Sequence, residues 1–119
     1  MERDERIGHN EALFREVNEQ VEALNKELSV HTPAKMDIVC ECGDLTCIER
    51  INVPVETYER IRGEATLFFV KAGHQQPEIE DVVEQTSTYN VVRKRSEGAR
   101  LVAEATDPRS AEATDRRTP

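Results

Sequence analysis

Tryptophan is absent from this chain, and only three phenylalanines and two tyrosines supply aromatic side chains among its 119 residues. No apolar run approaches the length of a membrane-spanning helix, so we expect no membrane association. Met1 to Arg6 hold no apolar stretch, which predicts that there is no secretory signal and that the protein is cytoplasmic. The length suits one small domain, and its core must be thin, so a bound metal ion would help to stabilise it.

Positive charge is also scarce. Lys and Arg total 16 against 24 Asp and Glu, which leaves a net charge of −8. The average surface therefore repels nucleic-acid phosphates and anionic lipids, and we expect no nucleic acid as partner. An acidic surface favours instead another protein with a basic surface.

The chain has only three cysteines, Cys40, Cys42 and Cys47, and they lie within eight residues. An odd number, clustered on one turn and in a reducing compartment, indicates metal ligands more than disulfides. Three thiolates suit zinc, which accepts tetrahedral sulfur ligands. Two alternatives remain: cysteines that pack as small hydrophobic residues, and an iron–sulfur cluster, which usually takes four cysteines.

A closed zinc site needs a fourth ligand. His74 is the preferred candidate, because it follows a glycine after an apolar run and the loop can bend toward the cysteines. His31 is the second candidate, and water or Asp44 the third. His9 lies at the start of the first helix and is the least suitable of the three histidines.

The cysteine loop, Cys40 to Cys47, resembles the zinc loop that follows the catalytic domain in many SET-type lysine methyltransferases. In those proteins a cysteine of the catalytic domain completes the site. This chain is too short for such a catalytic domain and has no fourth cysteine. The resemblance therefore supports zinc and implies nothing about methylation.

A broader resemblance covers residues 9–94. Its motifs are Asn10–Glu19, the cysteine loop, Glu56–Glu59 with Tyr58 inside it, and Ala72–Glu78 with its Gly-His pair. Together they resemble a widespread group of small bacterial proteins of unknown function. The resemblance implies a shared fold and a shared set of three cysteines and one histidine, and it implies no activity.

Residues 4–29 read as one long amphipathic helix. From Phe14 the apolar residues follow a spacing of 3, 4, 3, 4, through Val17, Val21, Leu24 and Leu28, which is the spacing of a helix-packing seam. Two interpretations compete: the stripe packs on the rest of the domain, or it pairs with a second copy in a homodimer. The outer face is expected to carry Glu11, Glu16, Glu19, Glu22, Lys26 and Glu27.

The expected fold class is α+β, a small zinc-stabilised domain of a few short strands covered by the long N-terminal helix. Residues 1–32 form the helix, 33–94 the zinc-binding core, and 95–119 a disordered tail. Within the core we expect strands at 36–40, 48–53, 67–70 and 89–93, a helix at 55–62 and helical turns at 77–84.

The function that these features favour is a zinc-stabilised interaction or regulatory protein without enzymatic activity. One alternative is a redox or metal sensor, in which oxidation of the thiolates releases zinc. Another is a metallohydrolase, which requires an open coordination position and Glu41 or Asp44 as the base.

Overall fold

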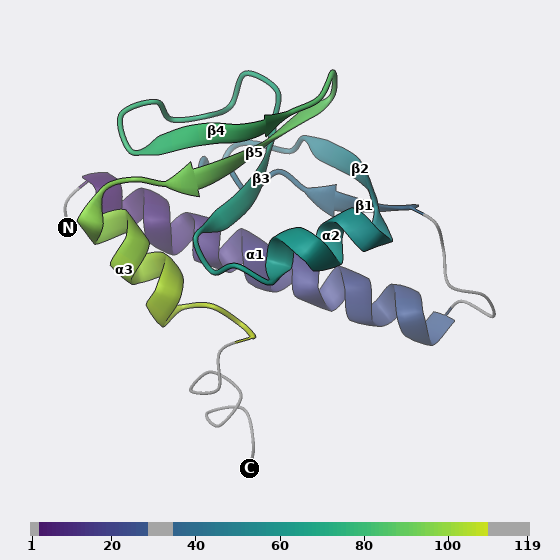
Figure 1. Ribbon diagram of the computed structural model, residues 1–119. Coiled ribbons are helices and arrows are strands. Elements are labelled where there is room, and N and C mark those ends of the chain that lie inside the picture. Colours follow the sequence, from purple (N-terminus) through teal and green to yellow (C-terminus); the bar gives the residue numbers. More distant parts are fainter. Residues whose placement is uncertain (1–2, 29–34, 110–119) are drawn as a thin grey trace, which may run out of the picture.

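The computed structural model describes residues 3–28 and 35–109, and within the first helix it describes the side chains of residues 8–25. Figure 1 shows the long helix α1 running along one side of the molecule, with the strands above it and two short helices beside it. The mixture of helices with small antiparallel sheets confirms the α+β class. In chain order the elements are α1 (Arg3–Leu28), β1 (Lys35–Val39), β2 (Arg50–Pro54), α2 (Val55–Arg62), β3 (Leu67–Lys71), β4 (Glu80–Gln85), β5 (Tyr89–Lys94) and α3 (Glu97–Ala105).

Two antiparallel sheets form the strand layer. β1 pairs with β2, with Ile38 opposite Ile51, and the second sheet has the order β3-β5-β4, with Phe69 opposite Val91. The central aromatic contact is Phe69, which stacks on Tyr58 of α2 with ring centroids 5.7 Å apart. The β3 run Leu67–Val70 is buried throughout, as its continuous apolar sequence predicts.

The helical turns predicted at 77–84 are wrong from Glu80 onward, whereas the backbone N–H groups of Ile79 and Glu80 both donate to the carbonyl of Gln76 and form a turn. Residues Glu80–Gln85 form strand β4, which pairs with β5 and contains a bulge between Val82 and Glu84. The apolar spacing of Ile79, Val82 and Val83 fits a helix, but only Ile79 is buried. Neighbouring β-branched residues favour a strand once β5 supplies a partner, and that partner lies outside the local pattern.

The disordered tail predicted at 95–119 is also wrong in its first part. Residues Glu97–Ala105 form helix α3, whose N-cap is Ser96: its hydroxyl accepts a hydrogen bond from the backbone N–H of Ala99. Ala99 and Ala103 are buried. Small alanines gave little apolar signal in the sequence, yet they allow close helix packing. Residues 110–119 lie outside the described part of the chain.

Close approach of α1 and α3 depends on Gly8. A Cβ atom added to Gly8 would lie 3.1 Å from a methyl carbon of Val102. Beyond α3, Arg109 reaches back and pairs with Glu19 of α1 and Glu59 of α2. The segment after β5 is therefore part of the folded domain as far as residue 109.

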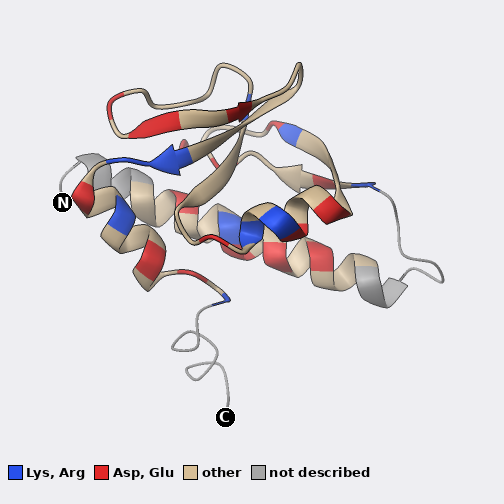
Figure 2. Cartoon of the chain, in the orientation of Figure 1, with Lys and Arg blue, Asp and Glu red and all other residues tan. Residues whose placement is uncertain are grey.

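Helix α1 turns its polar side inward. Glu11, Arg15, Asn18 and Glu22, which follow one another at helical spacing, are all 5% exposed or less. The acidic outer face predicted for this helix is therefore wrong for Glu11 and Glu22. Figure 2 shows charged segments of both signs where α1 runs behind α2.

The apolar stripe of α1 lies on the other side. Val17 is 36% exposed and Leu24 is 54% exposed, while Phe14 and Val21 are only half-buried. The interpretation in which this stripe packs on the domain is wrong for Val17 and Leu24. The side of α1 that faces the domain carries polar side chains instead, and these form hydrogen bonds or ion pairs inside the domain.

A lysine holds two buried carboxylates together in the core. The ammonium group of Lys94 pairs with both Glu11 and Glu80, and all three side chains are 1% exposed or less. It also lies 5.2 Å from the ring centroid of Phe68. Burial raises the pKa of Glu11 to about 8, and the nearby Glu80 adds to the shift while Lys94 opposes it. When Glu11 holds this proton, its side chain adds no negative charge to the buried cluster.

This cluster predicts a stability that depends on pH. The folded protein retains a proton at Glu11 that the unfolded chain releases above pH 4.5, so the free energy of unfolding should fall as pH rises from 4.5 to about 8. The slope is at most about 1.4 kcal/mol per pH unit. Glu11→Gln, which removes the titrating group, should flatten this part of the profile. Urea unfolding of metal-loaded parent and variant across this range measures both slopes, and identical slopes would contradict the assignment.

Candidate metal centre

The cysteine loop connects β1 to β2 and begins where β1 ends. The backbone N–H of Cys40 still pairs with the carbonyl of Glu49, so the ladder extends one step beyond the strand. Gly43 then adopts a φ of 83°, a conformation that glycine allows without strain. The N–H of Cys47 donates to the carbonyl of Asp44 at 3.0 Å, which closes a turn. These two bends bring Cys47 back beside Cys40 and Cys42.

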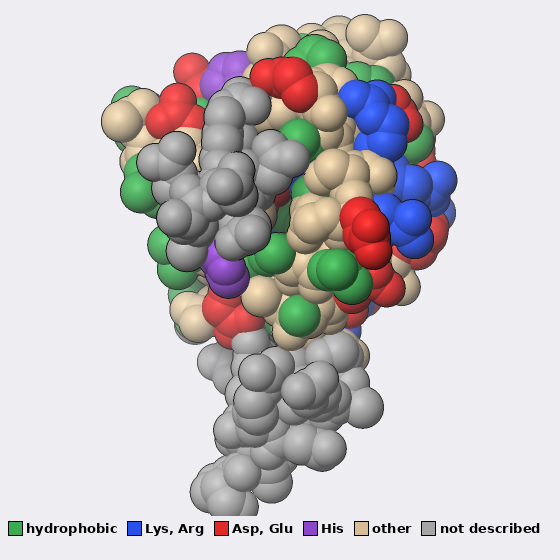
Figure 3. Space-filling model, turned by 90° about the vertical axis from the view of Figure 1, so that its left-hand side faces the viewer, with side chains coloured by type: hydrophobic (Ala, Val, Ile, Leu, Met, Phe, Trp, Pro, Cys, Tyr) green, Lys and Arg blue, Asp and Glu red, His purple; other side chains and the backbone are tan. Residues whose placement is uncertain are grey.

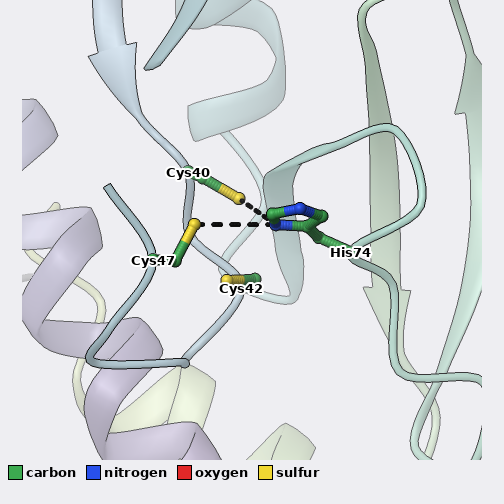
Figure 4. A group of neighbouring side chains, drawn as sticks. All are labelled: Cys40, Cys42, Cys47 and His74. Carbon is green, nitrogen blue, oxygen red and sulfur yellow. Dashed lines mark hydrogen bonds between the residues drawn. The ribbon is translucent and has the colours of Figure 1, made fainter. Parts of the chain in front are cut away.

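His74 comes from a separate turn that follows β3. Its backbone N–H donates to the carbonyl of Lys71 at 2.8 Å, and Gly73 takes a φ of 93°. Figure 4 shows the imidazole pointing from this turn toward the three sulfur atoms. The sequence prediction that a glycine bends His74 toward the cysteine turn agrees with this arrangement.

The four side chains form one compact cluster. One sulfur from each of Cys40, Cys42 and Cys47 and one ring nitrogen of His74 all lie within 4.8 Å of one another. Nδ1 of His74 is 3.6 Å from the sulfur of Cys40 and 3.6 Å from that of Cys47. A tetrahedral zinc ion, with Zn–S of about 2.3 Å and Zn–N of about 2.0–2.1 Å, separates its sulfur and nitrogen ligands by about 3.6 Å. The cluster could therefore bind a metal.

Hydrogen bonds and burial shift the pKa values of the cysteine thiols in opposite directions. The backbone N–H of Lys71 donates to the sulfur of Cys40 at 3.1 Å. A hydrogen bond from Cys40 is the main cause that lowers the pKa of the Cys42 thiol to about 5, although burial opposes it. The same hydrogen bond, together with burial, raises the pKa of Cys40 above its ordinary value. Without metal, the two thiols therefore share a proton that a bound cation would displace.

Glu41 lies between two of these cysteines but points the other way, into the domain. Its carboxylate accepts hydrogen bonds from Asn18 of α1 at 2.6 Å, from the N–H of Phe69 in β3 at 3.0 Å and from Arg62 of α2 at 2.8 and 3.2 Å. Both Glu41 and Arg62 are about 1% exposed or less. One carboxylate thus fastens the cysteine loop to three elements.

Sequence reasoning missed this role of Glu41 and treated the residue as an acidic loop group. A signal was present. The period of two along an extended chain puts Cys40 and Cys42 on one side and Glu41 on the other. The partners Asn18 and Arg62 gave no local signal, because they lie 23 and 21 residues from Glu41 in the sequence.

The remaining described candidates for the fourth ligand, Asp44 and His9, are not in the cluster. Asp44 is exposed and accepts hydrogen bonds from the backbone N–H and the hydroxyl of Thr46. His9 is exposed on α1. His31 lies outside the described residues. Among the described residues, His74 is the one histidine placed beside the cysteines.

An open depression of about 230 Å³ adjoins the cluster. Its walls include Cys42, Asp44, His74 and Gln75. No carboxylate among the described residues joins the three cysteines and the histidine as a fifth member of the group. Solvent can therefore reach the edge of the cluster, while its four ligand atoms face one another.

Comparisons with protein-family models, curated proteins and solved structures found no match to this chain. Within the part of the chain that the structure describes, no helix is both long enough and apolar enough to cross a membrane.

Proposed function

We propose that Cys40, Cys42, Cys47 and His74 bind one structural zinc ion and that the folded protein is an interaction or regulatory module without enzymatic activity. The observation that carries this proposal is the equal distance of 3.6 Å from His74 Nδ1 to two cysteine sulfurs. One nitrogen cannot make two good hydrogen bonds along one direction, whereas a shared cation between the atoms explains both distances. Soft thiolates and one imidazole are a ligand set that favours zinc.

Four protein ligands favour a structural metal over a catalytic one. A catalytic zinc keeps one position for water, and a hydrolase also needs a nearby base. Glu41 is fully engaged with Arg62 and is buried, so it cannot act as that base. Oδ1 of Asp44 already accepts two hydrogen bonds from Thr46. These contacts argue against the metallohydrolase alternative.

A metal at this position would join two parts of the fold. The cysteines belong to the connection between β1 and β2, whereas His74 follows β3 of the other sheet. The cysteine loop also contacts α1, because Asn10 donates to the carbonyl of Gly43 at 2.9 Å. Zinc would then fix the relative placement of both sheets and α1, which a thin core does less well alone. The same ligand set would extend to the small bacterial group that residues 9–94 resemble.

The first test is metal content and affinity. The purified parent should contain about one zinc ion per chain. His74→Ala should bind zinc at least about a hundredfold more weakly, since even loss of an outer partner of a ligand costs roughly 10–100-fold. His9→Ala is the matched control, because His9 is exposed and outside the cluster. Competition with a chromogenic chelator measures all three proteins.

Two results would overturn this assignment. Iron or no metal in a reduced, folded parent would remove the zinc proposal. If His74→Ala competed like the parent, His74 would not be the fourth ligand and His31 would be tested next by His31→Ala; if no histidine variant lost affinity, the site would be open and the hydrolase alternative would gain support.

A thiol-based sensor is the second candidate, and the half-exposed Cys47 favours it. Peroxide could oxidise Cys47 and Cys42 to a disulfide, with the two electrons reducing the peroxide to water and with release of zinc. Mild peroxide should then release the zinc, and a thiol reductant added afterwards should restore zinc binding. Retention of zinc under mild peroxide would contradict the sensor and would leave the structural zinc site as the remaining proposal.

A further inference from the structure

Helix α1 exposes an apolar face on a highly charged protein. Leu13 is 55% exposed, Val17 is 36% exposed and Leu24 is 54% exposed, and the half-buried Phe14 and Val21 lie beside them. At 100° per residue these five side chains occupy one side of the helix. Charged residues make up 34% of the chain, so an apolar stripe on its surface marks a contact site more than ordinary solvent exposure.

The spacing of this face is that of a helix-pairing seam. Phe14, Val17, Val21 and Leu24 follow intervals of 3, 4 and 3, which correspond to the a and d positions of heptads. The domain itself does not use this seam, because α1 meets the core through Glu11, Arg15 and Asn18. A partner for the seam must be a helix that presents the same spacing, and α1 of a second copy does so.

Net charge helps to distinguish a second copy of the chain from other possible partners of this face. Each chain has a net charge of −8, so two copies repel unless they meet through a neutral surface. Among the described side chains of α1, those classed as exposed are His9, Leu13, Val17, Gln20, Ala23 and Leu24, and none is acidic or a Lys or Arg. Glu11 is turned inward onto Lys94 and Glu19 onto Tyr58. The stripe of five apolar side chains carries no charge of its own, and the half-buried Glu16 lies beside it, next to the exposed Gln20 and Ala23.

Other apolar side chains are exposed outside α1, among them Leu45, Ile48 and Leu101. Figure 3 looks onto the end of the molecule at which α1 begins, and it shows hydrophobic side chains apart from the Lys and Arg side chains, which gather on the right. Among the described side chains of α1, a basic partner would find only half-buried glutamates, Glu16 and Glu19, beside the stripe. A neutral helix of the same spacing finds a complementary surface there.

We infer that the apolar face of α1 pairs with α1 of a second copy and makes the protein a homodimer. This inference rests on the proposed interaction module and gives it a partner. The contact is isologous, so each residue of the seam meets the same seam on the partner copy. The seam on α1 is linked to the proposed zinc site, because the side chain of Asn18 donates a hydrogen bond of 2.9 Å to the carbonyl of Val39, next to the cysteine loop.

The size of the face sets the expected strength. The apolar face runs from Leu13 to Leu24, which is about 18 Å of helix, and it is about 10 Å wide, so it offers on the order of 200 Å². A standard interface buries about 800 Å² per partner. We therefore expect a dimer that dissociates on dilution. Added NaCl should increase the dimer fraction, because it screens the repulsion between two acidic chains and breaks no ion pair in the seam.

Sedimentation equilibrium of the zinc-loaded full chain tests this inference. Leu24→Glu places like charges in the seam of both copies, and it should raise the dimer dissociation constant at least about tenfold. Leu101→Glu is the matched control: Leu101 is also a helical leucine, 60% exposed on α3, and its change should leave the dimer intact. Val17→Glu should behave like Leu24→Glu.

A parent that stays monomeric at all concentrations and salt levels would overturn the inference, and so would equal weakening by Leu24→Glu and Leu101→Glu. Zinc content is measured on the same samples. A monomer that retains one zinc per chain contradicts the dimer alone, whereas a dimer without zinc contradicts the proposed metal site alone.

Discussion

Replacing Cys40 with serine is expected to remove the bound metal and most of the protein's stability. The Cys40 sulfur faces His74 at 3.6 Å and accepts the N–H of Lys71 at 3.1 Å, so it belongs to both the cluster and the backbone beside β3. Serine is a poor ligand for zinc and cannot reproduce a thiolate. Binding energy of a structural zinc is folding energy, about 10–16 kcal/mol in small zinc peptides, which exceeds the whole stability of most small domains.

The measurement combines elemental analysis with thermal unfolding. Cys40→Ser should contain little zinc. It should either lose its cooperative unfolding transition or have a melting temperature more than about 10 °C below that of the parent, because each kcal/mol shifts the midpoint of a small domain by about 4–8 °C. The parent stripped with a chelator should behave like the variant, and zinc should restore only the parent. A variant that keeps one zinc and the parent's midpoint would contradict the structural role of the site.

Replacing Glu41 with glutamine is expected to give the second large loss. The carboxylate of Glu41 pairs with Arg62 through two hydrogen bonds in a site that is about 1% exposed or less. Glutamine keeps the shape but leaves the Arg62 guanidinium buried without a negative partner. Breaking a buried ion pair from one side costs about 3–5 kcal/mol. Urea unfolding of the metal-loaded proteins gives this difference directly.

Glu49→Gln is the control for the Glu41 prediction. Glu49 is 50% exposed and pairs with Lys71 at 3.7 Å, so its replacement should cost no more than about 1 kcal/mol. A double-mutant cycle with Arg62→Gln adds a second measurement: the pair should show a coupling energy of about 0.5–3 kcal/mol. Equal losses from Glu41→Gln and Glu49→Gln, or a coupling near zero, would show that Glu41 does not anchor the cysteine loop.

Local sequence rules were sufficient for much of the fold. Pro54 before a short amphipathic segment predicted a helix at 55–62, and α2 occupies Val55–Arg62. The apolar run at 67–70 is inside strand β3. The three clustered cysteines and the Gly73-His74 pair also carried their own chemistry, and the structure brings all four candidate ligands together. Ligand type, spacing and glycine conformation are properties of short segments, which explains why they could be read from the sequence.

The sequence left open which side of α1 faces the core. Its heptad spacing predicted an apolar seam, yet the interpretation in which this seam packs on the domain was wrong for Val17 and Leu24, which are exposed. The inward side is chosen by residues far along the chain: Lys94 meets Glu11 across 83 residues, and Arg15 donates to the carbonyl of Ala103 across 88. Such partners turn a polar stripe into an interior one, and no local pattern contains them.

By itself, then, the sequence determined the kinds of atom at the candidate metal centre, the position of α1 and α2, and most strands. The tertiary structure alone decided that 80–85 is a strand, that 97–105 is a docked helix, and that Glu41 points into the domain and pairs with Arg62. The physical reason is the same in each case. A β-strand needs a neighbouring strand, an alanine-rich helix needs a close surface, and a buried carboxylate needs its cation, and each partner is supplied by a segment distant in the sequence.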